Sequence, residues 1–150
     1  MSNLDTIMLL NRLIVTTKNG EAALRAAASE VYHPELQETL EEYSRFMADA
    51  ARELQAEVEA LGGKPKGTGT FDNTLHRTWL HIKASAYGRD EAVILDTVEA
   101  DEQETDARFA DALTWSTPPE IHALLERQYQ GTHLRHDHIR QLRQQMGHPA

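Results

Sequence analysis

A chain of 150 residues, 40% of them hydrophobic, is long enough for a globular domain with its own core and is too apolar for a disordered chain. Its formal net charge of −9 argues against general binding to nucleic-acid phosphates, which needs a basic face. The absence of cysteine excludes disulfides and thiolate chemistry. The opening MSNLDTIMLLNRLIV lacks the cationic start and cleavage site of a signal peptide, and no apolar run reaches the ~18 residues of a membrane span. We therefore expect a cytoplasmic protein that binds neither nucleic acid nor membrane.

Clusters of glycine and proline divide the chain into segments with the apolar period of an α-helix, and none of these segments has the alternation of a strand. The first predicted helix spans about residues 4–32, is capped by Ser2 or Asn3, and stops before a proline. Gly20, which is unusual in mid-helix, indicates close approach by a neighbouring element. The second predicted helix spans about residues 34–61. Because the turn between the two is short, we expect them to pack as antiparallel neighbours.

A glycine-rich linker at about residues 62–70 leads to a shorter predicted helix at about residues 71–87. At ~1.5 Å per residue this helix could run most of the length of the bundle. Two more long helices are predicted, at about residues 90–115 and 118–146, and they form a second antiparallel pair. The linker and the shorter helix then make a long crossover between the pairs. We predict an all-α, ferritin-like four-helix bundle that forms a single domain over residues 1–150.

Several short motifs resemble those of the DUF2383 family. They are HRTW at 76–79 with Lys83, the pair Glu99 and Glu102, RQ at 127–128 and HDHIRQLR at 136–143, with further agreement in NGEAALRAAA at 19–28 and ELQAEVEALGG at 53–63. The resemblance covers most of the chain, from about Leu4 to Arg143, and depends on the order and spacing of the motifs together. It implies a ferritin-like four-helix bundle and no assigned biochemical role.

Polar residues interrupt the predicted buried faces of the first, third and fourth helices near the middle of the bundle. Glu21 lies on the apolar stripe of the first helix and Glu102 on that of the third, while Glu53 flanks the stripe of the second. An unpaired buried carboxylate is costly, so these groups need a cationic partner or a metal ion. Carboxylate and imidazole ligands suit iron or manganese. One hypothesis is therefore a metal site made from Glu21, Glu53, Glu99, Glu102 and His136.

The full di-iron signature of a ferritin-like bundle is absent. That signature needs a Glu-x-x-His pair on each of two helices, whereas the one such pair in this chain is Glu30 with His33, beside the first turn. The opposing interpretation is structural, with the buried carboxylates paired to Lys18, Arg45 or Arg135 in a network that fixes the helix register. The sequence favours this network, because cations lie at neighbouring levels.

Three histidines, His133, His136 and His138, lie close together on the fourth predicted helix. His133 and His136 share a face and would suit a nickel- or zinc-type surface site. A solvated or capping cluster is the favoured interpretation, since helix C-termini favour histidine and arginine. The acidic run from 96 to 106 is interpreted mostly as a solvated face.

The sequence carries no nucleophile–base pair, phosphate loop or dinucleotide fingerprint. The leading hypothesis is a non-catalytic bundle that forms a homo-oligomer and acts through binding or as a stress-related accessory protein. The alternative is an iron- or manganese-binding protein with a carboxylate-rich site inside the bundle. The missing Glu-x-x-His pairs favour the first hypothesis.

Overall fold

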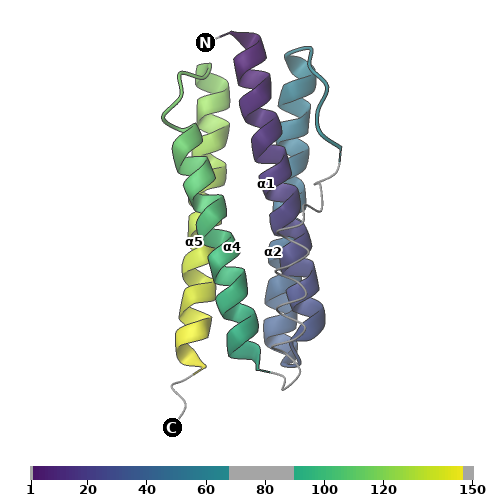
Figure 1. Cartoon of the computed structure of the whole chain (residues 1–150), viewed down its shortest axis with the longest axis vertical. Coiled ribbons are helices and arrows are strands. Elements are labelled where there is room, and N and C mark those ends of the chain that lie inside the picture. The colour runs from purple at the N-terminus through teal and green to yellow at the C-terminus, as the bar shows by residue number, and fades with distance from the viewer. Residues whose placement is uncertain (1, 68–89, 147–150) are drawn as a thin grey trace.

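The computed structural model describes residues 2–67 and 90–146, which form four long helices (Figure 1). The helices are α1 (Asn3–Glu30), α2 (Pro34–Ala60), α4 (Glu91–Ala112) and α5 (Pro119–Gln145). α1 and α2 form one antiparallel hairpin, α4 and α5 form another, and α1 packs beside α4. The prediction of an all-α four-helix bundle built from these two pairs is confirmed. The predicted crossover helix at 71–87 lies outside the described residues.

Local signals at the helix ends explain their bounds. Ser2, one of the two caps that the sequence predicts, caps α1 and forms a reciprocal capping box with Asp5. Asp90 caps α4, because its side chain accepts a hydrogen bond from the backbone N–H of Ala92 at 3.0 Å. Just after α2, Gly62 has a φ of 84°, in the left-handed region that favours glycine, and the helix ends there. The four helices begin and end within three residues of their predicted limits.

Buried apolar side chains form two separate clusters along the bundle. One lies at the end where α1 begins, and includes Leu10 and Phe109. The other lies towards the α1–α2 turn, and includes Leu24 and Leu95. Between the clusters α2 buries Ala50 and Ala51, but the buried side chains of the other three helices are polar: Thr17 and Glu21 of α1, Glu102 and Thr105 of α4, and Gln128, Thr132 and His136 of α5. We call these seven residues the polar waist, and they confirm that α1, α4 and α5 carry polar groups on their buried faces near the middle.

α1 and α2 approach each other closely beside the polar waist. A Cβ atom built on Gly20 would lie 2.7 Å from Met47 Cε, closer than real contacts allow, so the close approach predicted at Gly20 is confirmed. One turn along α2 from Met47, the Ser44 hydroxyl donates to the backbone oxygen of Glu21 at 3.1 Å. Gly20 and Ser44 therefore hold α1 and α2 close together at the level of the polar waist.

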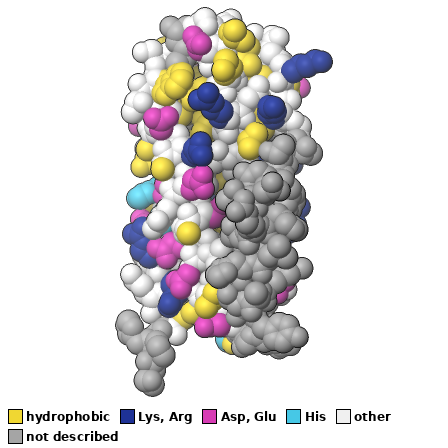
Figure 2. Space-filling view, viewed as in Figure 1, with side chains coloured by type: hydrophobic (Ala, Val, Ile, Leu, Met, Phe, Trp, Pro, Cys, Tyr) yellow, Lys and Arg dark blue, Asp and Glu magenta, His cyan; other side chains and the backbone are white. Residues whose placement is uncertain are grey.

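The surface mixes charged and apolar side chains. Acidic and basic groups are interspersed on the face that Figure 2 shows. The exposed large hydrophobic side chains come from several places on the bundle, among them Leu4 and Met8 on α1, Phe46 on α2 and Leu134 on α5. Among the described residues they do not mark one apolar face for self-association, so the homo-oligomer stays a prediction. None of the described helices is long and apolar enough to cross a membrane.

Candidate metal site

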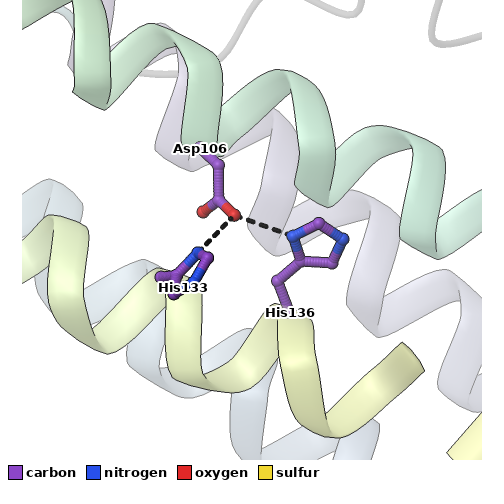
Figure 3. Close-up of side chains that lie close together, drawn as sticks. All are labelled: Asp106, His133 and His136. Atoms are coloured by element: carbon purple, nitrogen blue, oxygen red, sulfur yellow. Dashed lines mark hydrogen bonds and ion pairs between the residues drawn. The ribbon is translucent and has the colours of Figure 1, made fainter. Parts of the chain in front are cut away.

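Asp106 of α4 converges with His133 and His136 of α5 between the two helices (Figure 3). The two histidines are three residues apart and therefore lie on the same face of α5. Asp106 Oδ2 lies 2.7 Å from His136 Nδ1 and 3.3 Å from His133 Nδ1. One potential ligand atom from each side chain lies within 4.8 Å of the other two. Since bonds from zinc to nitrogen or oxygen ligands are about 2.0–2.2 Å, small side-chain movements would let all three hold one ion.

The cluster is buried on its inner side and open on its outer side. The His136 side chain is 4% exposed and that of Asp106 is 13% exposed, whereas His133 is half exposed. The second carboxylate oxygen of Asp106, Oδ1, is buried and has no hydrogen-bond partner within the described part of the chain. A buried carboxylate oxygen without a donor is costly, and a bound cation would remove that cost. The exposed edge of His133 provides access from solvent.

Further polar side chains close a ring around the cluster. His133 Nε2 lies 3.6 Å from Asp137 Oδ2, and Asp137 Oδ1 lies 3.6 Å from Arg140 Nη1. Arg140 Nη2 in turn lies 3.5 Å from His136 Nε2. The Nε group of Arg140 also donates to Glu99 Oε1 of α4 at 3.3 Å. Each histidine is therefore held at both ring nitrogens, which restricts its orientation.

Three of the five residues predicted as metal ligands form ion pairs. The pairs are Glu21 with Lys18 and Arg25, Glu53 with Arg127, and Glu99 with Arg140. The Glu21–Lys18 pair, at 3.3 Å, is one that the structural interpretation predicted. Neither Arg45 nor Arg135, the other predicted partners, forms an ion pair with a described residue. A carboxylate that already faces a cation is a poorer ligand for another cation, so these contacts favour the structural interpretation at three positions.

Glu102 lies in a different environment. Its side chain is buried, and its Oε2 atom has no hydrogen-bond partner within the described residues. Burial raises the pKa of Glu102 to about 8; the charges of Asp101 and Asp106 add to that rise, and Arg135 opposes it. Burial, together with the charge of Glu104, also raises the pKa of Asp101, to about 6. At neutral pH Glu102 therefore holds a proton, and it must lose that proton before it can bind a metal.

The cluster contains one of the five predicted ligands, His136. Within residues 2–67 and 90–146, the side chains that bring three potential ligand atoms together are Asp106, His133 and His136. The sequence placed the two histidines on one face but treated Asp106 as the end of a solvated acidic run. The missed signal was spacing, because Asp106 lies four residues after Glu102 and so shares its face of α4. The five-residue metal site stays a prediction.

Comparison with known proteins supports the resemblance noted in the sequence. The family model for the domain of unknown function DUF2383 matches residues 5–114. The matched region contains α2, α4 with Asp106, and α1 from its third residue, and it ends before α5, which carries His133 and His136. No curated protein matches the chain in sequence.

Proposed function

The chain belongs to the DUF2383 family, and we propose that this member binds a divalent metal ion through Asp106, His133 and His136. One observation carries the proposal: three ligand atoms from two helices converge beside Asp106 Oδ1, a buried carboxylate oxygen with no partner among the described residues. Surface groups of acidic residues are common without ions. This group differs because it joins two imidazoles to a carboxylate that is mostly buried.

The donor set indicates the class of metal. Imidazole nitrogen suits zinc, nickel, copper and iron(II), whereas magnesium and calcium prefer oxygen ligands alone. Two imidazoles and one carboxylate therefore favour a first-row transition metal. With three protein ligands the ion would keep at least one position for water, as in open zinc sites. Iron suits this set of ligands, and it also suits the carboxylate-rich hypothesis. Manganese suits this set of ligands less well than iron does.

Metal titration of variants tests the proposal. Chelator-stripped protein, titrated anaerobically with Zn(II), Ni(II), Fe(II) and Mn(II) in turn, should bind one ion per chain and prefer the first three. His136→Ala and Asp106→Asn each remove a ligand, and each should weaken metal binding by about a hundredfold or more. Changes to residues that only hydrogen-bond to a ligand already lower metal affinity by about 10–100-fold. Metal counted per chain after equilibrium dialysis, with calorimetric affinities, measures both effects.

The matched control is His122→Ala. His122 also lies on α5, so this variant loses one histidine without touching the cluster. It should bind metal like the wild type, and circular dichroism should show that all variants stay helical. Equal affinity in His136→Ala, Asp106→Asn and His122→Ala would mean that any binding is to scattered surface groups, and the proposal would be wrong.

The same titration separates this site from the carboxylate-rich hypothesis. A site made from Glu21, Glu53, Glu99, Glu102 and His136 should be lost in Glu102→Ala and unaffected by Asp106→Asn. The imidazole site should behave the opposite way. The ion pairs at three of those carboxylates and the proton on Glu102 support the imidazole site.

We also retain the hypothesis that the protein self-associates and acts without catalysis. The exposed pair Leu4 and Met8, one turn apart on α1, offers a small apolar surface for a contact between copies. Sedimentation velocity over a wide range of concentrations should then show a mass above that of one chain. A strict monomer at every concentration would rule out self-association while leaving the metal proposal intact.

A further inference from the structure

The two histidines of the cluster differ in the group that meets their second ring nitrogen. In metal sites a ligating histidine donates its other ring N–H to an acceptor, commonly a carboxylate or a carbonyl. His133 fits this rule, because its Nδ1 faces Asp106 and its Nε2 lies 3.6 Å from Asp137 Oδ2. His136 does not fit it. Its Nδ1 also faces Asp106, but its Nε2 lies 3.5 Å from Nη2 of Arg140.

Arg140 and Asp106 require the same proton arrangement on His136. A guanidinium is only a donor, so Nε2 of His136 must be the acceptor and carry no proton. An ionised carboxylate only accepts, so Nδ1 must carry the proton that it donates to Asp106 Oδ2. A metal bound at Nδ1 reverses this arrangement, because the metal takes the Nδ1 lone pair and the proton then resides on Nε2. The Nε2–H and the Arg140 N–H would face each other as two donors.

We propose that Arg140 holds the site in its metal-free form, and that a metal ion must displace the guanidinium from His136 in order to bind. This inference rests on the metal-binding function proposed above. The positive charge of Arg140 also opposes a dication beside His136, so it acts in the same direction as the donor conflict. Arg140 is therefore a positioning residue that lowers metal affinity, and it is not itself a ligand.

The surroundings of Arg140 allow this displacement. Its Nε atom lies 3.3 Å from Glu99 Oε1 and its Nη1 atom lies 3.6 Å from Asp137 Oδ1, so it keeps two carboxylate partners after leaving His136. Its side chain is 44% exposed, which leaves room to move outwards. The Asp137 carboxylate faces both Arg140 and His133, and so links the displaced cation to the second histidine.

The test is the Zn(II) affinity of Arg140→Gln, measured by calorimetry with a competing chelator. The amide oxygen of glutamine can accept from Nε2–H, so this change replaces a donor by an acceptor and removes a charge. We expect zinc to bind about tenfold more tightly than to the wild type, within the range that changes around metal ligands usually produce. Arg140→Lys keeps both the charge and the donor, and should return the affinity close to the wild-type value.

Arg143→Gln is the matched control. Arg143 lies three residues further along α5 and pairs with Asp96 of α4 at 2.7 Å. Its removal takes away the same charge and an ion pair between the same helices, without touching either histidine. Its zinc affinity should stay near that of the wild type. The melting temperature in chelator should fall slightly for both glutamine variants, so a purely structural role for Arg140 would change the melting temperature without tightening metal binding.

The outcomes separate this inference from the proposed function. Asp106-dependent zinc binding in the wild type that is no tighter in Arg140→Gln, or is equally tightened in Arg143→Gln, overturns the role of Arg140 alone. Binding that appears only in Arg140→Gln and is lost on adding Asp106→Asn supports the inference strongly. If neither the wild type nor Arg140→Gln binds zinc through Asp106, both proposals are wrong.

Discussion

Replacing Glu102 with glutamine is expected to make the protein more stable at pH 8. The side chain is 1% exposed, and burial raises its pKa to about 8. When the carboxyl group ionises, the folded protein must hold its charge in the interior near Asp101 and Asp106, whereas glutamine is neutral and nearly the same shape. A pKa raised from 4.5 to about 8 corresponds to a destabilisation of the order of 4 kcal/mol at pH 8, which the substitution should largely remove.

The sign of the pKa change determines the pH profile. Between about pH 4.5 and 8 the folded state keeps a proton on Glu102 that the unfolded state has released, so stability falls as the pH rises. The raised pKa of Asp101, about 6, adds a decline of the same sign between 3.8 and 6. Urea unfolding across this range should show both declines in the wild type. In Glu102→Gln the decline between pH 6 and 8 should be absent and the one at lower pH retained.

Glu104→Gln is the control for this experiment. It removes the same charge two residues away on α4, from a side chain that is 63% exposed and pairs with Arg108. Exposed pairs of this kind contribute about 0–1 kcal/mol, so the decline between pH 6 and 8 should hardly change. The decline at lower pH should weaken, because the charge of Glu104 helps to raise the pKa of Asp101. A Glu102→Gln protein that follows the wild-type profile up to pH 8 would show that Glu102 ionises normally in the folded state, through solvent or a partner in the interior.

The fold could largely be predicted from the sequence because its determinants are local. A helical apolar period fixes which face of each segment is buried, and caps, prolines and glycines fix where each helix ends. The same counting identified Glu21 and Glu102 as polar residues on buried faces, and both are buried. Gly20 was informative for a similar reason, since a mid-helix glycine is costly unless a neighbour such as Met47 needs the space.

The metal cluster could not be predicted as well, because it depends on contacts between residues that are far apart in the sequence. Periodicity assigns a residue to a face, but it does not say which side chain from another helix will meet it. Glu53 illustrates the limit, because its partner Arg127 lies 74 residues further along the chain. Asp106 illustrates it again: in the acidic run that it ends, Asp96 and Glu104 are exposed, whereas the side chain of Asp106 turns towards α5 and accepts from two histidines. A charge run therefore has to be divided by helical face before it is called solvated.

Replacing Glu91 with alanine is expected to lower the free energy of unfolding by about 3 kcal/mol. Glu91 begins α4 and reaches the turn between α1 and α2, where its Oε2 accepts from the backbone N–H groups of Tyr32 at 2.9 Å and His33 at 3.0 Å. Its Oε1 pairs with the ring of His33, and the side chain is 4% exposed. Alanine would leave both N–H groups without this acceptor, and hydrogen bonds to charged groups contribute about 1.5–3 kcal/mol each. Urea unfolding near neutral pH measures the loss.

The contribution of Glu91 should depend on pH in the opposite sense to that of Glu102. Burial alone would raise the pKa of Glu91, but the hydrogen bonds from His33 and Tyr32 outweigh it and hold the pKa below its usual value. A lowered pKa stabilises the folded state above the unfolded value of 4.5, and this stabilisation is lost as the pH falls through the folded value. The stability difference between wild type and Glu91→Gln should therefore be largest near neutral pH and shrink in acid.

Glu35→Ala is the control for Glu91→Ala. Glu35 lies in the first turn of α2, is exposed, and interacts mainly with the helix dipole, an effect of about 0.3–1 kcal/mol. A much larger loss in Glu91→Ala than in Glu35→Ala would show that α4 holds the α1–α2 turn, and so joins the two hairpins at this end of the bundle. Equal losses would mean that water satisfies the two N–H groups as well as the carboxylate does. The hairpins would then depend on the apolar cluster around Leu24 and Leu95 for their alignment.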